Sequence, residues 1–233
     1  PTASTTSEVP LTGAVVYFPR DSTRGVRLAR ERREVRADDV VAGAVEAMLA
    51  GPRDPDYIGG WAPGTRLLGV STSGDVTTVD LSAEARTTTL GSEASAAAVD
   101  QLVWTVTEVT GAGSRVLLTI EGQPSGELWG VLSWDEPQAR RDAFTVRVPV
   151  AIDAPLEGDE VTSPVTVTGN AAVYEANLPW RVFDESGELA EEGFTMTAEG
   201  QTFADYSFTV DLEPGTYVVE IREDDPSAGE GGP

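Results

Sequence analysis

The side chains able to do chemistry in this sequence are carboxylates and guanidinium groups. The 233 residues include 39 acidic residues and 16 basic residues, all of them arginine, with no histidine and no cysteine. Ser82 and Ser92 therefore have no histidine or lysine to activate them, and there is no thiolate to act as nucleophile or zinc ligand. This inventory excludes serine, cysteine and Schiff-base chemistry, and it predicts no cofactor.

The carboxylates leave two kinds of site open. Glycoside hydrolysis needs only two carboxylates at a defined separation, and Asp54 with Asp56 is one such pair. Calcium takes oxygen ligands, but the acidic clusters lack the spacing of a calcium loop. With so many acids, solvated surface groups are the better interpretation, so we expect no catalytic and no metal-binding residues. The clusters in question are Asp153, Glu157, Asp159 and Glu160 near the middle of the chain, and Glu223, Asp224 and Asp225 near its end.

A run of arginines is the most distinctive charged feature. Guanidinium groups bind carboxylates and other anions through two parallel hydrogen bonds, so the run predicts a protein-docking face. The partner would be an acidic envelope protein, a neighbouring copy of this chain, or an anionic cell-wall polymer. The competing interpretation is an edge strand that charge protects from aggregation. The predicted face consists of Arg20, Arg24, Arg27, Arg30, Arg32, Arg33 and Arg36.

The overall charge limits the partners. A net charge of −23 and a pI near 4.1 disfavour binding to nucleic acid and to anionic lipid surfaces. Residues 1–150 hold 20 acids and 14 arginines, a net charge of −6, whereas residues 151–233 hold 19 acids and two arginines, a net charge of −17. This asymmetry indicates two units with different surfaces. The absence of lysine fits a high-GC genome, such as that of an actinobacterium, or a salt-rich habitat.

The five tryptophans allow two interpretations. Exposed indoles would form a platform on which sugars stack, as a wall-glycan-binding module requires. Tryptophan is highly buried on average, so core packing is the prediction. The residues are Trp61, Trp104, Trp129, Trp134 and Trp180.

Hydrophobic periodicity predicts the elements that position these groups in the first half. Gly13–Pro19 is rich in β-branched and aromatic residues and predicts a strand, and the arginine run predicts a second, exposed strand. A helix follows Asp38 or Asp39 and ends before Gly51, and another begins at Ser92. We expect an α+β domain, a mixed sheet with two helices on one face. Its other strands are Arg66–Ser71, Val76–Leu81 and Arg115–Glu121.

Helical periodicity disappears from Phe144 onward, where short strands recur between turns, which is typical of an all-β sandwich. The predicted strands are Phe144–Ile152, Val165–Gly169, Ala172–Phe183, Leu189–Thr197, Thr202–Val210 and Tyr217–Ile221. The predicted organisation is a flexible tether at 1–9, the α+β domain at 10–125, a connection at 126–143, the sandwich at 144–223 and a disordered tail at 224–233. The connection carries Trp129 and Trp134, which we expect to pack against one of the domains.

The sequence also resembles two known families. Val15–Phe18, Leu49-Ala50-Gly51-Pro52, Val79-Asp80-Leu81-Ser82 and Gln101–Thr105 occur in the order seen in GerMN domains of sporulation and germination proteins. Val161–Gly169, Val173–Asn177 and Asp184–Glu188 resemble the immunoglobulin-like domain of bacterial spore-germination proteins. That family's domain closes with a further strand, but only the polar stretch Arg222–Pro233 follows Ile221.

The resemblance implies an extracytoplasmic, non-enzymatic protein of sporulation or germination type, chiefly known among lipoproteins of Gram-positive bacteria, and acting as an assembly or docking scaffold. Ring-building by some GerMN-like modules implies homo-oligomerisation. No stretch of the sequence is long and apolar enough to span a membrane. The Ser/Thr/Pro-rich start leads us to expect that an N-terminal anchor has been removed, leaving that anchor as the only membrane contact. Wall-glycan binding is the leading alternative function, ahead of a calcium-dependent adhesion-like module and a glycoside hydrolase.

Overall fold

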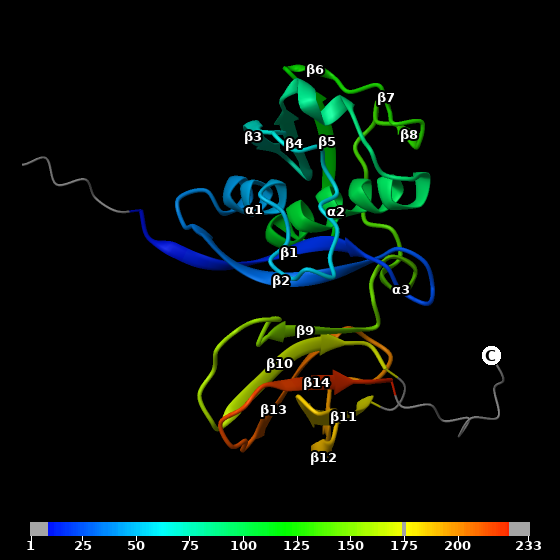
Figure 1. Cartoon of the computed structure of the whole chain (residues 1–233). Coiled ribbons are helices and arrows are strands. Elements are labelled where there is room, and N and C mark those ends of the chain that lie inside the picture. Colours follow the sequence, from blue (N-terminus) through cyan, green and yellow to red (C-terminus); the bar gives the residue numbers. More distant parts are fainter. Residues whose placement is uncertain (1–8, 174–175, 224–233) are drawn as a thin grey trace, which may run out of the picture. The chain divides into compact units, whose positions relative to one another are not determined.

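The chain folds into two compact units that divide between Arg147 and Val148 (Figure 1). The computed structural model describes residues 9–173 and 176–223, so the predicted tail and all but the last residue of the predicted tether lie outside the described residues. The first unit is an α+β domain with a mixed sheet and two long helices, and the second is an all-β sandwich, as the sequence predicts. Within the described part of the chain, no helix has the length and hydropathy that a membrane span requires.

A long antiparallel hairpin opens the first unit. Strand β1 (Leu11–Arg20) pairs along its whole length with β2 (Arg27–Arg36), and the two strands form a sheet of their own. Ser22 and Gly25 close the turn through two backbone hydrogen bonds of 3.1 Å. Gly25 adopts a φ of +85°, which a residue with a Cβ rarely accepts. The predicted exposed strand is therefore one arm of this hairpin.

Two helices form the middle of the first unit. Helix α1 (Val40–Leu49) begins at Asp39, whose carboxylate accepts a 3.0 Å hydrogen bond from the backbone of Ala42 as an N-cap. Helix α2 (Ser92–Thr110) contributes a stripe of buried apolar residues to the same core, and Gly111 ends it. Both helices begin and end close to where their capping residues predict.

A four-stranded sheet completes the first unit. Strands β4 (Val76–Leu81) and β5 (Arg115–Ile120) run parallel, joined by the short 3₁₀ helix η1 (Ala83–Arg86) and α2, while the other neighbouring strands of this sheet are antiparallel. Figure 1 shows α1 and α2 between this sheet and the β1–β2 hairpin, instead of on one face of a single sheet. The helices bury both of their sides because the hairpin covers the side that the sheet leaves open. The sheet order is β3 (Leu67–Ser73), β4 (Val76–Leu81), β5 (Arg115–Ile120) and β6 (Gln123–Pro124).

The predicted connection packs onto the first unit. It contains the small hairpin of β7 (Glu127–Leu128) and β8 (Leu132–Ser133), and the helical turn α3 (Ala143–Val146) begins at its last residue. Trp134 is fully buried and donates a 3.0 Å hydrogen bond to the backbone oxygen of Val116. The expectation that its tryptophans join a domain core is confirmed. The strand predicted from Phe144 instead begins at Val150, because Asp142 caps the turn α3.

The second unit contains two three-stranded antiparallel sheets. The order is β13–β10–β9 in one sheet and β12–β11–β14 in the other. Trp180 of β11 stacks on Phe208 of β13 with ring centroids 4.5 Å apart, within the core between the sheets. The strands are β9 (Val150–Ala154), β10 (Val165–Ala171), β11 (Asn177–Asp184), β12 (Leu189–Met196), β13 (Ala204–Val210) and β14 (Tyr217–Ile221).

Candidate functional site

The β1–β2 hairpin distributes its arginines over two faces. Side chains alternate along a strand, and paired residues of neighbouring strands share a face. Tyr17 pairs with Arg30 on one face, whereas Ala14 pairs with Arg33 on the other. Arg32 and Arg36 share the face of Arg30. The seven arginines of the predicted docking face therefore do not form one continuous surface.

Arg33 lies on the face that covers α1 and is buried. Its guanidinium donates to the Glu31 carboxylate at 2.6 Å and to the backbone oxygen of Gly51 at 2.8 Å. Glu31 has no exposed surface, and its second oxygen accepts the backbone N–H groups of Arg53 and Asp54 at 2.9 and 3.0 Å. This pair anchors the loop that leaves α1, so Arg33 serves packing and is not available for docking.

The remaining arginines of the hairpin differ in exposure. Arg30 is almost fully buried, and Arg20 and Arg27 are partly buried. Arg24, in the turn, and Arg32 and Arg36, on β2, are exposed and make the accessible cationic surface of this hairpin. Arg20 and Arg36 lie 3.7 Å from Asp56 and Asp38, at the long end of ion pairing. We refer to Arg24, Arg32 and Arg36 as the hairpin arginines.

A cluster of aromatic and cationic side chains lies beside the hairpin. Tyr17 meets Trp104 edge to face at 5.5 Å, and Arg140 lies over the Trp104 ring at 4.3 Å. Glu108 accepts from both the Tyr17 hydroxyl at 3.1 Å and Arg140 at 2.6 Å. Burial raises the pKa of Tyr17 to about 12, although the charge of Arg147 opposes this. Burial also lowers the pKa of the Arg147 guanidinium. The cluster joins β1 and α2 to the segment before α3.

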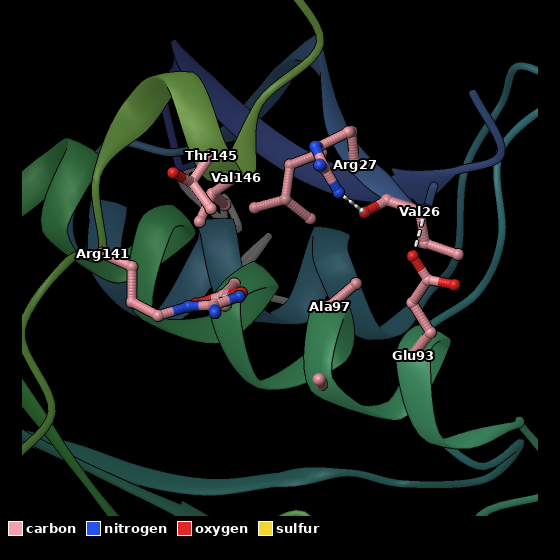
Figure 2. Close-up of a pocket in the computed structure, with 10 residues that line it drawn as sticks. Val26, Arg27, Glu93, Ala97, Arg141, Thr145 and Val146 are labelled. Atoms are coloured by element: carbon pink, nitrogen blue, oxygen red, sulfur yellow. Dashed lines mark hydrogen bonds and ion pairs between the residues drawn. The ribbon is translucent and has the colours of Figure 1, made fainter. Parts of the chain in front are cut away.

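A small cavity opens between the start of β2, the first half of α2 and α3 (Figure 2). Its volume is about 210 Å³, below the roughly 300 to 1,000 Å³ typical of small-molecule sites. Asp100 binds Arg141 through both oxygens, which raises the pKa of that guanidinium, and Glu93 accepts the backbone N–H of Val26 at 2.9 Å. Both carboxylates are thus engaged, and neither is placed as a general base.

The paired carboxylates considered for hydrolysis have structural partners. Asp54 accepts the backbone N–H of Asp56 at 2.9 Å in a local turn, while the Asp56 side chain is 65% exposed next to Arg20.

Two other carboxylates have a lowered pKa. A hydrogen bond from Ser82 lowers the pKa of Glu84, and a hydrogen bond from Ser186 lowers the pKa of Asp184. An acid catalyst needs the opposite shift. These geometries favour the interpretation of solvated surface acids.

The acidic clusters considered for calcium do not converge. Asp153 is buried on β9, whereas Glu157, Asp159 and Glu160 are exposed, and Asp159 accepts the backbone N–H of Leu156 at 2.8 Å. Within residues 148–173 and 176–223, no three carboxylates bring their oxygens within 4.8 Å of one another. Glu223 is exposed, and Asp224 and Asp225 lie outside the described residues.

None of the five tryptophans presents an exposed ring. Trp61, Trp104 and Trp134 are buried, and Trp129 packs edge to face against Trp61 at 5.0 Å. Trp180 is partly buried in its stack on Phe208. The prediction of core packing is confirmed, and a platform of indoles for sugar stacking is not formed.

The sequence left the aromatic cluster and the cavity unpredicted. Arg140 and Arg141 are adjacent in the connection. The sequence signal for their ion pairs was one acidic residue on α2 for each arginine, Glu108 for Arg140 and Asp100 for Arg141. Glu108 and Asp100 lie eight residues apart on one helix, within reach of the two arginines. Asp100 also interrupts the apolar stripe of α2, which is a signal for a buried ion pair.

Comparison with family profiles assigns both units. Residues 15–126 match the family described as sporulation and spore germination, and residues 149–230 match the immunoglobulin-like domain of bacterial spore germination. Comparison with curated proteins finds no match.

Solved structures provide two similar domains. The tandem GerMN domains of the sporulation protein GerM from Bacillus subtilis superpose with a TM-score of 0.46 at 14% identity, over 60% of this chain and 49% of that one. The present chain thus spans about half the length of that protein. The first GerMN domain of the same protein gives a TM-score of 0.41 at 15% identity, over 56% of this chain and 98% of that one.

Proposed function

Because the chain joins a domain of the sporulation and spore germination family to an immunoglobulin-like domain of bacterial spore germination, we propose that it is a non-enzymatic assembly scaffold. It docks through the β1–β2 hairpin onto an acidic surface, which a second copy of the chain can itself supply. The observation that carries this proposal is the set of exposed cationic side chains on the hairpin: Arg24, Arg32 and Arg36 are exposed on a chain of net charge −23.

The complementary surface is the second unit. Residues 148–233 hold 19 acids and two arginines, so a neighbouring copy offers strong negative charge to the hairpin arginines. Complementary charge steers association and fixes which surfaces meet, but salt screens it over a Debye length of about 8 Å at physiological ionic strength. Arginine suits this role because its planar guanidinium binds carboxylates through two hydrogen bonds. Association through the hairpin should therefore weaken as salt increases.

The absence of enzymatic activity is supported by the side-chain inventory. The chain contains no histidine, cysteine or lysine. The carboxylates that line the cavity are held by Arg141 and by the backbone of Val26. A scaffold needs none of these catalytic groups, whereas most hydrolases need at least one.

We propose an extracytoplasmic location, with an N-terminal lipid anchor, because the two-family architecture resembles that of Gram-positive lipoproteins. Labelling of host cells with a palmitate analogue tests this for the full-length protein. Labelled protein in the membrane fraction supports the anchor. Unlabelled protein in the cytoplasm contradicts it.

Charge reversal on the hairpin tests the docking surface. We expect Arg24→Glu/Arg36→Glu to lower the average molar mass measured by light scattering at about 50 mM salt, and the difference from wild type to disappear at about 500 mM. Arg66→Glu/Arg115→Glu is the matched control, because it makes the same charge change at exposed positions of the same unit. The control should behave as wild type.

Other outcomes would redirect the proposal. Equal masses of wild type and hairpin variant at every salt concentration would contradict self-assembly through the hairpin. If the wild-type protein stayed monomeric and sedimented with isolated cell-wall material, the wall-glycan-binding function would replace the scaffold proposal. Activity on a wall substrate that a paired carboxylate substitution abolished would contradict the non-enzymatic assignment.

A further inference from the structure

One face of the second unit is apolar and exposed. It is the outer side of the sheet β12–β11–β14, opposite the side that faces β10 and β13. Phe194 and Met196 of β12 are 70% and 59% exposed, and Val218 of β14 and Leu189 of β12 are 58% and 49% exposed. By strand register, Pro179 and Phe183 of β11 lie on the same side. These six residues are the outer sheet face.

Strand β12 has its apolar side turned away from the core. Sandwich strands normally direct apolar residues inward and polar residues outward. In β12 the inward positions include Glu191, Gly193 and Thr195, whereas the outward positions include Leu189, Phe194 and Met196. Within the described residues of the second unit, the inversion leaves these three apolar side chains outside the core.

The inward side of β12 is fixed by its neighbours. A Cβ on Gly193 would lie 2.5 Å from the Trp180 ring, which passes directly beneath this strand. Thr195 donates its hydroxyl to the backbone oxygen of Ser207 in β13 at 2.9 Å. A shift of register by one residue would lose both arrangements, so β12 cannot turn its apolar side inward.

The charged side chains beside the outer sheet face form two ion pairs, so their net charge is zero. Arg181 lies 3.3 Å from Glu192, and Arg222 lies 2.6 Å from Glu220. Arg181, Glu192 and Glu220 lie on this side of the sheet by strand register, and Arg222 directly follows β14 and donates its backbone N–H to Pro179. Arg181 and Arg222 are also the only arginines among residues 148–233, which carry 19 acids. The outer sheet face is therefore an electrically neutral area on a strongly acidic unit.

We propose that the outer sheet face is a dimer interface at which two copies of this chain meet through the same surface across a two-fold axis. A second copy is the fitting occupant because two acidic second units repel each other over the rest of their surfaces, while this neutral area does not add to that repulsion. The four exposed apolar side chains present on the order of 400 Å², about half of the roughly 800 Å² that each partner buries in a standard interface. The paired charges supply a polar rim, and the symmetric contact closes at two copies.

This interface is distinct from the arginine hairpin and has the opposite salt dependence. Salt screens the repulsion between two copies of net charge −23 and strengthens apolar burial, so the dimer should tighten as salt increases. Docking through the hairpin arginines should weaken under the same change. The two contacts can therefore fail independently of each other.

Sedimentation equilibrium of the whole chain at about 1 M salt tests the interface. We expect a dimer whose dissociation constant rises at least about tenfold in Phe194→Glu, since the new carboxylate would have to be buried at the contact. Val161→Glu is the matched control because Val161 is 53% exposed in the same unit but lies outside the outer sheet face. The control should change the dissociation constant by less than about twofold.

The proposal is overturned if the wild type stays monomeric at high salt, or if Phe194→Glu dimerises as wild type does. Circular dichroism melts of both variants verify the fold, because Phe194 and Val161 are exposed and their replacement should leave the core intact. If Phe194→Glu nevertheless unfolds, Met196→Glu is the second variant. Loss of the low-salt assembly alone would implicate the hairpin proposal and leave this interface standing.

Discussion

The buried pair Glu31–Arg33 makes the sharpest stability prediction. Replacing Glu31 with alanine removes the carboxylate that Arg33 contacts at 2.6 Å and the acceptor of two backbone N–H groups. Arg33 is only 9% exposed, so its charge would stay buried without a counter-charge, with the backbone oxygen of Gly51 as a remaining hydrogen-bond acceptor. Breaking such a pair costs about 3 to 5 kcal/mol. With a urea m-value of about 1 to 3 kcal/mol per molar, the unfolding midpoint should fall by about 2 M.

Tryptophan fluorescence in a urea titration measures this effect, because four of the five tryptophans lie in the first unit. A double-mutant cycle with Arg33→Met identifies the cause. Glu31→Ala/Arg33→Met should be clearly more stable than the sum of the single losses predicts, since it leaves no unpaired charge. A loss below about 1 kcal/mol for Glu31→Ala, or additive losses in the cycle, would refute the assignment of Arg33 to packing.

Two further substitutions and one titration test the side-chain packing within the two units. Gly193→Ala should destabilise the second unit by about 1 to 3 kcal/mol, because the new methyl group would lie 2.5 Å from the Trp180 ring; an unchanged thermal melt would contradict this. Trp134→Phe should cost the first unit about 2 kcal/mol, measured in urea, through the lost hydrogen bond to Val116 and the smaller ring; a loss within error would show that the site is not tightly packed. Tyr17 should ionise near pH 12 in an ultraviolet titration, and its contribution to stability should be complete below about pH 10 and lost as pH rises toward 12; ionisation of every tyrosine near pH 10 would contradict its burial.

The helices and most strands were predictable because their signals are local. Asp39 caps α1 and Gly111 ends α2, and both sites are readable from residue type and spacing. The start of β9 was not predictable from local signals, since Phe144 and Thr145 are residue types that favour a strand. The hydrogen bond from the backbone of Thr145 to Asp142 instead closes a helical turn there.

The division of the arginines between two faces of the hairpin illustrates a different limit. Strand alternation shows that Arg33 and Arg32 point in opposite directions, but not which direction faces α1. That depends on the long-range packing of α1 against the hairpin. Glu31, two residues before Arg33 and on the same face, was the available signal for a buried pair.

The outer sheet face shows the same limit in the second unit. The sequence Phe194-Thr195-Met196 indicates that the two large apolar residues share one side of β12. An apolar side is normally assigned to the core. The position of Trp180 under Gly193 and the hydrogen bond from Thr195 to Ser207 show that this side points outward, and neither is readable from the local sequence.

The most direct test of assembly through the arginine hairpin is the molar mass of wild type and Arg24→Glu/Arg36→Glu by light scattering at about 50 mM and about 500 mM salt. Charge-driven docking predicts a larger mass for wild type at low salt and equal masses at high salt. Equal masses at low salt, over concentrations at which wild type associates, would contradict it.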